Sequence, residues 1–247
     1  MIAIALLTFK PDPELIKFYK NIPRDNYDFY CFIDDNNINR SLTNDYLNSI
    51  QIDDYFCAIN GFHGFNPVIK KNNAPLVSAW DKAILYFCLQ NRSYEHIWFI
   101  EDDVFVPDIN LFKIIDSQYN NADLLSSENV INTSGELESW EWWKMASNSN
   151  LPLPWAKSMV CALRVSKTMM KLLSDHVSKN KDRYKFIEYI FHTLALHNKL
   201  SVKVVGNLSG IVWRRDWVKE ELNSNILYHP VKSVDKQTAF REYLNGQ

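Results

Sequence analysis

Two hydrophobic runs of the sequence end in adjacent carboxylates. The run at residues 27–33 is followed by Asp-Asp at 34–35, and the run at 96–100 is followed by Glu-Asp-Asp at 101–103. Three acidic side chains in a row repel one another unless a cation or solvent relieves the repulsion. A hard divalent cation such as Mn²⁺ or Mg²⁺ prefers oxygen ligands and can bridge a carboxylate to a diphosphate. The two clusters therefore predict a cation-assisted site for a phosphate-containing ligand; the alternative is an acidic surface turn that caps the next helix.

Glycine is scarce in this chain, with only six among 247 residues. Neither the dinucleotide fingerprint G-x-G-x-x-G nor the P-loop pattern G-x-x-x-x-G-K-[ST] can be written anywhere in the sequence. Both patterns need glycine at the places where the backbone closes on phosphate. A bound nucleotide would therefore have to be held by other groups, and a cation held by carboxylates is one such group.

Strand-like and helix-like patterns alternate along the chain. Continuous apolar runs predict strands buried on both faces, and apolar residues at helical spacing predict helices. The predicted strands lie at 2–7, 27–33, 55–59, 96–100, 123–126, 158–163 and 201–205. The predicted helices lie at 13–21, 41–50, 76–88, 109–119, 167–177 and 184–197, before a last short helix. Asp12 and Ser166 are the expected N-caps of two of them. This alternation predicts one α/β domain with a mostly parallel sheet, whose ligands lie beyond the carboxyl ends of the strands.

The segment 129–154 is polar, rich in tryptophan and without clean periodicity. Ordered loops of this length inside a domain are usually functional. Trp140, Trp142 and Trp143 flank Glu141 here; indole rings stack well on the C–H faces of sugars, and a carboxylate can bond their hydroxyl groups. The alternative is a lid in which the rings fold back over the core. A second segment, WRRDW at 213–217, could meet an anionic ligand, although a solvent-facing amphipathic segment is the favoured interpretation.

The composition is that of an ordinary globular protein, with 47% hydrophobic and 23% charged residues. A formal net charge of -2 creates no field that attracts nucleic acid or anionic lipid, so neither is an expected partner. The four cysteines lie far apart in apolar stretches, which favours buried free thiols over disulfides or zinc ligands. No run approaches the roughly 18 apolar residues of a membrane helix and no signal-peptide pattern is found, so a cytoplasmic location is expected.

The segment HIWFIEDDVFVPD at 96–108 resembles the D-x-D strand of glycosyltransferases with the GT-A fold. Further segments are similar in the same order along the chain. LLTFK and IDD resemble the ends of the first two strands, SAWDKAILYF a helix with a Lys or Arg near the sugar diphosphate, and LYHPVK a C-terminal segment that returns to the site. The resemblance implies one GT-A-like domain over 1–247, with a nucleotide-sugar-binding half at 1–108 and an acceptor-binding half at 109–247.

The resemblance also implies roles for individual residues. The metal ligands would be Glu101, Asp103 and His229, binding Mn²⁺ or Mg²⁺, although an ordinary packing role for His229 stays open. The residues expected to contact the nucleotide sugar are Thr8, Asp34, Asp35, Lys82, Asp102 and Lys232. The residues expected to contact the acceptor are Trp140, Trp142 and Trp143.

Glu188 is the expected general base. It lies between two isoleucines at a helix start, where partial burial would raise its pKa toward a useful range. The alternative is a first-turn glutamate that complements the helix dipole. Glu141 is the second candidate base. If the reaction retains configuration instead of inverting it, Glu188 would only bind the sugar.

The resemblance and the acidic clusters together predict a cation-assisted glycosyltransferase. It would move a sugar from a nucleotide-diphosphate sugar to a hydroxyl of a carbohydrate or glycoconjugate acceptor, with inversion through a carboxylate base. One alternative is a non-catalytic carbohydrate- or nucleotide-sugar-binding protein of the same fold. Another is a sugar-phosphate nucleotidyltransferase, which is disfavoured because such enzymes usually carry a glycine- and basic-rich loop after the first strand, where this chain has TFKPDPE.

Overall fold

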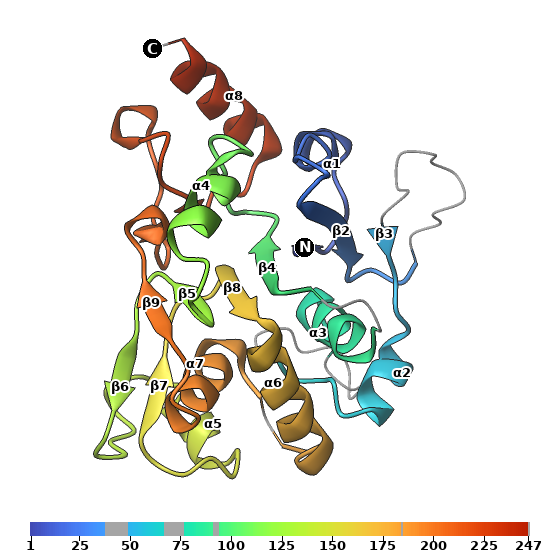
Figure 1. Cartoon of the computed structure of the whole chain (residues 1–247), viewed down its shortest axis with the longest axis vertical. Helices are drawn as coiled ribbons and strands as arrows, with labels where there is room; N and C mark the ends of the chain where they lie inside the picture. Colours follow the sequence, from blue (N-terminus) through green and yellow to red (C-terminus); the bar gives the residue numbers. More distant parts are fainter. Residues whose placement is uncertain (38–48, 67–76, 91–93, 184, 247) are drawn as a thin grey trace.

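A seven-stranded sheet forms the centre of the molecule. The computed structural model of the chain describes residues 1–37, 49–66, 77–90, 94–183 and 185–246 (Figure 1). The strand order is β3-β2-β1-β4-β8-β5-β9. These strands are β1 Ile2–Thr8, β2 Tyr27–Ile33, β3 Ser49–Ile50, β4 His96–Glu101, β5 Leu124–Ser126, β8 Ala162–Ser166 and β9 Val202–Val204. Neighbouring strands are parallel except where β8 runs antiparallel to β4 and β5. The prediction of a mostly parallel α/β sheet is confirmed.

The first strand is buried on both faces, as its continuous apolar run predicts. Ala3, Ala5 and Leu7 join one hydrophobic cluster, while Ile4 and Leu6 join another on the opposite face of the sheet. All five side chains are at most 3% exposed. Burying both faces of a strand requires layers on both sides of the sheet, and these layers fix where the carboxyl ends of the central strands lie.

Helices supply these two layers (Figure 1). The layer against Ile4 contains α1 (Pro13–Tyr19) and α4 (Leu111–Gln118). The layer against Ala3 contains α3 (Ala79–Leu89), α6 (Lys167–Lys179) and α7 (Ile187–His197). The two predicted N-caps are confirmed, because the side chains of Asp12 and Ser166 accept backbone N–H bonds at the starts of α1 and α6.

The prediction of a strand at 55–59 is wrong, because this segment forms a helix, α2 (Asp54–Ile59). The side chain of Asp53 accepts a hydrogen bond from the backbone of Phe56 and so starts the helix. Only Cys57 is buried, whereas Tyr55 is 69% exposed. Short apolar runs do not distinguish a strand from a helix. The helix predicted at 41–50 lies outside the described residues, except for its last two, which form β3.

The strand predicted at 158–163 is displaced along the chain. Trp155–Lys157 forms a separate strand, β7, which pairs antiparallel with β6 (Val130–Asn132). The backbone N–H of Ser158 then donates to the carbonyl of Glu188 on α7 at 2.9 Å, and β8 begins only at Ala162. The segment 129–154, which lacks clean periodicity in the sequence, contains β6 and a short helix, α5 (Trp143–Ser147).

The C-terminal segment returns to the residues that follow β4. A small parallel sheet joins β10 (Gly210–Ile211) to β11 (Tyr228–His229), and two 3₁₀ helices, Gly206–Leu208 and Lys219–Glu221, lie before β11 in the chain. Tyr228 exchanges backbone hydrogen bonds with Phe105, and the N–H of Val231 donates to the carbonyl of Asp103 at 2.7 Å. The last helix, α8 (Val234–Asn245), follows. The expected division of the chain into two halves at residue 108 stays a prediction.

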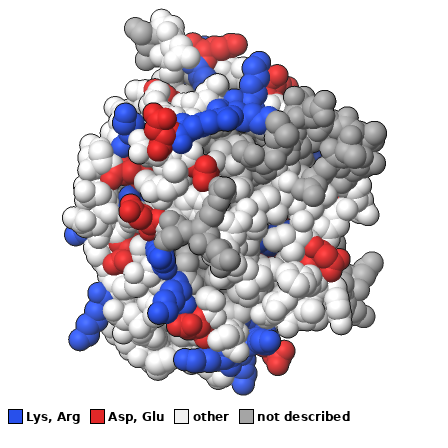
Figure 2. All heavy atoms as spheres, turned by 45° about the vertical axis from the view of Figure 1, so that its right-hand side comes forward, with Lys and Arg blue, Asp and Glu red and all other residues white. Residues whose placement is uncertain are grey.

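Three properties of the whole chain can be compared with the expectations from composition. All four cysteines are free thiols, as predicted. No helix in the part of the chain that the structure describes has the length and apolar character to cross a bilayer. Figure 2 shows acidic and basic side chains lying next to one another on the face it presents, in keeping with a formal net charge of -2.

Candidate functional site

The carboxyl ends of β1, β2 and β4 meet at one edge of the sheet. The parallel register places Thr8 beside Ile33 and Leu7 beside Glu101. A cleft of about 200 Å³ opens at this edge. Its polar lining includes Thr8, Asp34, Ser78, Glu101, Asp102 and Asp103. Asp34 of the first acidic cluster and all three residues of the second are therefore brought to a single cleft, at the place where open parallel sheets bind their ligands.

Asp102 is tied to the first strand. The hydroxyl of Thr8 donates to its carboxylate at 2.5 Å, and the backbone N–H of Asp102 donates to the carbonyl of Leu7 at 3.0 Å. Burial raises the pKa of Asp102, and the hydrogen bond from Thr8 opposes this rise. Thr8 and Asp102 thus present a paired hydroxyl and carboxylate to the cleft, a combination suited to sugar or ribose hydroxyl groups.

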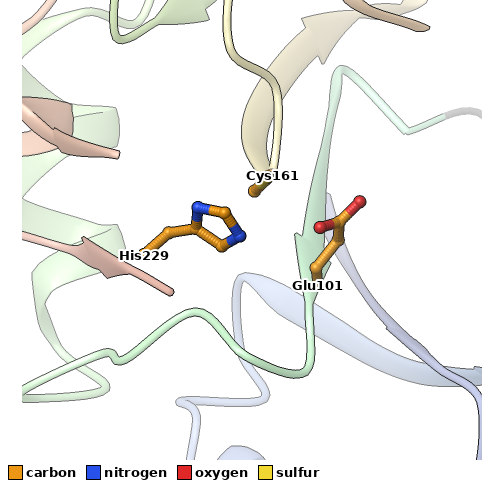
Figure 3. A group of neighbouring side chains, drawn as sticks. All are labelled: Glu101, Cys161 and His229. Atoms are coloured by element: carbon orange, nitrogen blue, oxygen red, sulfur yellow. The ribbon is translucent and has the colours of Figure 1, made fainter. Parts of the chain in front are cut away.

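Glu101, Cys161 and His229 come together beside the cleft (Figure 3). One ligand atom from each lies within 4.8 Å of the ligand atoms of the other two. Asp103 adjoins them, with its Oδ1 atom 3.4 Å from Nε2 of His229. The other ring nitrogen, Nδ1, lies 2.9 Å from the carbonyl of Val212. A proton on Nδ1 donating to that carbonyl leaves the Nε2 lone pair facing the carboxylates, which is the usual arrangement of a metal-binding histidine.

The electrostatics of this cluster fit a divalent cation. Burial raises the pKa of Glu101 and the charge of Asp103 adds to the rise, while a hydrogen bond of 2.7 Å from the Trp80 indole opposes it. Burial acts to lower the pKa of His229, but Asp103 and Glu101 raise it above its ordinary value. Among the described residues, Asp103 Oδ1 is one of the buried polar atoms without a hydrogen-bond partner. A cation would relieve the carboxylate repulsion and give this oxygen a partner.

Lys82 has a different position from the one the resemblance implies. Its side chain is fully buried and does not line the cleft. The ammonium group donates to the carbonyls of Ile33 and Asp34, at 3.2 and 2.6 Å, and forms an ion pair with Asp54 at 3.1 Å. A fully buried ammonium committed to backbone carbonyls cannot also reach a ligand in the cleft. Lys82 instead fixes the end of β2, and so the position of Asp34.

Asp34 and Asp35 are placed differently. Asp34 is 8% exposed and lines the cleft. The carboxylate of Asp35 accepts hydrogen bonds from the backbone and side chain of Asn37, and is not part of the cleft lining. Asp35 therefore shapes the turn after β2. Lys232 is exposed and follows Val231, which is bonded to the Asp103 carbonyl.

A second cavity, of about 720 Å³, is lined in part by Ile211, Val212 and Glu188. Val212 connects this cavity to the cluster of Glu101, Cys161 and His229, because it lines the cavity and its carbonyl oxygen lies 2.9 Å from Nδ1 of His229. Other parts of the lining are Glu128, Trp140, Glu141, Trp142, Lys157, Met159, Phe186, Trp213 and Arg214. The cavity thus combines aromatic rings with several charged groups, as expected for a site that binds a sugar.

Glu188 has the electrostatic character of a general base. Burial raises its pKa to about 7; the positive charge of Lys157 opposes the rise, and the carboxylates of Glu101 and Glu128 add to it. A carboxylate with a pKa near neutrality accepts and releases protons readily at neutral pH. Glu141, the second candidate, is exposed on the same cavity.

The three tryptophans that the sequence groups together have different surroundings. Trp143 is 1% exposed and packs in the core against Trp155, with ring centroids 6.0 Å apart, so its expected contact with an acceptor is wrong. Trp140 and Trp142 are half-buried and line the cavity, where both rings pack against Phe186. The spacing of the tryptophans does not reveal this difference, because the short helix α5 turns one ring inward.

The roles of Cys161 and of the segment 213–217 in the site differ from those that the sequence favours. Cys161 was expected only as a buried free thiol, and its place beside Glu101 depends on the pairing of β8 with β4. Trp217 is buried and donates its indole N–H to the carbonyl of His229 at 3.1 Å. Trp213 is 62% exposed, with the guanidinium of Arg214 4.9 Å from its ring. The segment 213–217 therefore faces the cavity at one end and supports His229 at the other.

Comparison with known proteins gives matches among solved structures alone. No family model and no curated protein matches the chain. The chain is similar to the galactosyltransferase LgtC in complex with donor and acceptor sugar analogues, with 12% identity, a TM-score of 0.48, and 98% of this chain and 95% of that chain covered. An active-site mutant of LgtC gives 11% identity, a TM-score of 0.48, and 100% and 96% coverage. Mouse xyloside xylosyltransferase 1, in its apo form, gives 12% identity, a TM-score of 0.39, and 83% and 85% coverage.

Proposed function

We propose that this chain is a GT-A-like glycosyltransferase that uses a divalent cation to move a sugar from a nucleotide-diphosphate sugar to an acceptor hydroxyl. The observation that supports this most is that three features meet around His229. Glu101 and Asp103 line the cleft, and Asp103 lies 3.4 Å from His229. The ring of His229 in turn contacts the carbonyl of Val212, which lines the second cavity. This arrangement supports neighbouring sites for donor, cation and acceptor.

The cleft is the proposed donor site. The carboxylates of Asp34 and Asp102 and the hydroxyl oxygen of Thr8, whose proton is donated to Asp102, offer hydrogen-bond acceptors for ribose and sugar hydroxyl groups. Glu101, Asp103 and His229 would hold Mn²⁺ or Mg²⁺. When bound, the ion supplies neutralising charge for the departing diphosphate. This explains how a chain with six glycines could bind a diphosphate without a glycine-rich loop.

The second cavity is the proposed acceptor site. Trp140 and Trp142 would stack on sugar rings and orient the acceptor hydroxyl. Glu188 would take the proton of that hydroxyl as its oxygen attacks the anomeric carbon, while the bond from that carbon to the diphosphate breaks and its electron pair leaves with the diphosphate. Direct displacement of this kind inverts the anomeric configuration. Glu141 is the second candidate for the proton transfer.

A ligand-binding screen tests the donor site. The thermal unfolding midpoint is measured with UDP-, GDP- and CMP-linked sugars, with and without Mn²⁺. A donor at about 100 times its Kd should raise the midpoint by roughly 5–10 °C, and only with the cation. Asp103→Ala should abolish the rise. Asp175→Ala, at an exposed position on α6, should retain it.

Turnover distinguishes the enzyme from a binding protein. With the donor identified by the screen, release of the nucleoside diphosphate is measured against a panel of carbohydrate acceptors. Acceptor-dependent release supports transfer. A cation-dependent rise without release for any acceptor would instead identify a non-catalytic nucleotide-sugar-binding protein, and no rise with any donor would contradict the proposal. Release of pyrophosphate from a nucleoside triphosphate and a sugar phosphate would identify a nucleotidyltransferase.

A further inference from the structure

Cys161 lies directly across from Glu101 in the sheet. The antiparallel register of β4 and β8 pairs Ile100 with Ala162, so the next pair along the strands is Glu101 with Cys161. The backbone N–H of Glu101 donates to the carbonyl of Cys161 at 2.9 Å. Side chains of directly opposite residues project from the same face of a sheet. The thiol and the carboxylate are therefore held side by side by backbone pairing, and not by chance contact of flexible side chains.

His229 approaches this pair from the C-terminal segment (Figure 3). Its Nδ1 atom lies 2.9 Å from the Val212 carbonyl, and its own carbonyl accepts the indole N–H of Trp217 at 3.1 Å. The contact with Val212 orients the ring and the bond from Trp217 holds the His229 backbone, so that Nε2 is on the side of Glu101 and Cys161. The ligand atoms of these three residues lie within 4.8 Å of one another.

Asp103 adjoins this group on the His229 side and offers a further oxygen. Its Oδ1 atom is buried without a hydrogen-bond partner and lies 3.4 Å from Nε2 of His229. The edge of a tetrahedron built on bonds of about 2.0–2.3 Å is about 3.3–3.8 Å long. The Asp103–His229 separation already has this length. The ligand atoms of Glu101, Cys161 and His229 lie within 4.8 Å of one another, so side-chain movements of about 1 Å would bring these three to it.

We propose that Cys161 is a fourth ligand of the cation site, and that its sulfur widens the affinity of the site for Zn²⁺, Co²⁺ or Cd²⁺ relative to the Mn²⁺ or Mg²⁺ of the proposed function. The inference rests on the proposed function in placing a cation at this cluster. Thiolates favour the first three ions, whereas carboxylates and water suit Mn²⁺ and Mg²⁺. On binding, a metal–sulfur bond forms and the thiol proton is released to solvent. Cys161 and His229 are each 6% exposed, so little water competes for their side of the ion.

Optical absorption of the Co²⁺-loaded protein tests this directly. A thiolate ligand gives a near-ultraviolet charge-transfer band in addition to the visible d–d bands of Co²⁺. The wild-type chain should show both, and Cys161→Ser should lose the charge-transfer band while it keeps the visible bands. Cys88→Ser is the matched control, because Cys88 is a free thiol outside the cluster; it should keep both. Cd²⁺ affinity should fall about tenfold or more in Cys161→Ser, with Mn²⁺ affinity little changed.

The ¹¹³Cd NMR shift of the wild-type chain gives a second measurement that needs no variant, so that a folding defect of Cys161→Ser does not affect the result. A shift in the range of one sulfur ligand supports the proposal. Visible Co²⁺ bands without a charge-transfer band, or a ¹¹³Cd shift typical of oxygen and nitrogen ligands alone, would overturn it. Both spectra are independent of turnover. A charge-transfer band in a chain that binds no donor would contradict the proposed function and leave this inference standing.

Discussion

At the scale of single residues, the surroundings of the Glu188 carboxylate disfavour its charged form and so suit it to proton transfer. It lines the second cavity, and its pKa is raised to about 7, chiefly by burial. A base must be deprotonated to act, so kcat should rise with pH through about 7 and level off above it. Glu188→Gln should lower kcat by roughly 10²–10⁴-fold. Glu242→Gln, on the exposed side of α8, should leave the pH profile unchanged. If the pH profile of kcat is unaltered in Glu188→Gln, Glu188 is not the base, and either Glu141 takes the proton or the reaction uses no base.

The same carboxylate should weaken the fold at high pH. Its pKa is about 7 in the folded chain against an ordinary value of 4.5, so the folded state binds the proton more tightly. The free energy of unfolding therefore falls as pH rises from about 4.5 through 7. Relative to wild type, Glu188→Gln should be more stable by about 1–2 kcal/mol at pH 8 and little changed at pH 4.5, since solvent screens a half-buried group. Urea unfolding at the two pH values measures the difference, and an equal effect at both would argue against a raised pKa.

At the scale of elements, the end of β2 depends on a lysine from α3. Lys82 is fully buried and donates to the carbonyls of Ile33 and Asp34. Lys82→Met should lower the free energy of unfolding by about 2–4 kcal/mol, because these carbonyls lose their partner. Lys10→Met, at an exposed position, should change it by less than about 0.5 kcal/mol. Unfolding in urea measures both. A loss of donor affinity in Lys82→Met at unchanged stability would instead restore the contact with the nucleotide sugar that the resemblance implies for Lys82.

The elements also show what could be predicted from the sequence. β1, β2 and β4 could be placed within about a residue, because strands covered on both faces leave continuous apolar runs that end in polar site residues. The segment 55–59 could not, because its apolar residues are mostly exposed and a capping aspartate decides its conformation. Cys161 and Trp143 could not be assigned for another reason. Their surroundings depend on strand register and on packing between distant segments, and neither leaves a local pattern.

At the scale of the molecule, the candidate cation site joins two segments that are far apart in the chain. Glu101 ends β4 and Asp103 follows it, while His229 belongs to the returning C-terminal segment. Backbone hydrogen bonds link the same segments, from Val231 to Asp103 and between Phe105 and Tyr228. A cation bound to both segments should therefore stabilise their contact and not only its own ligands.

Cation binding should accordingly be visible in the folding of the whole chain. A divalent cation at about 100 times its Kd adds about 2.7 kcal/mol to the free energy of unfolding. Hydrogen exchange of the Val231 and Phe105 amides should slow in the same titration, because both bonds cross between the two segments. His229→Ala should lose both effects, whereas His197→Gln, on α7 and outside the cluster, should keep them. Chelation by EDTA should reverse the change. Slower exchange confined to other parts of the sheet would place the cation elsewhere and would remove the basis for a site shared by β4 and the C-terminal segment.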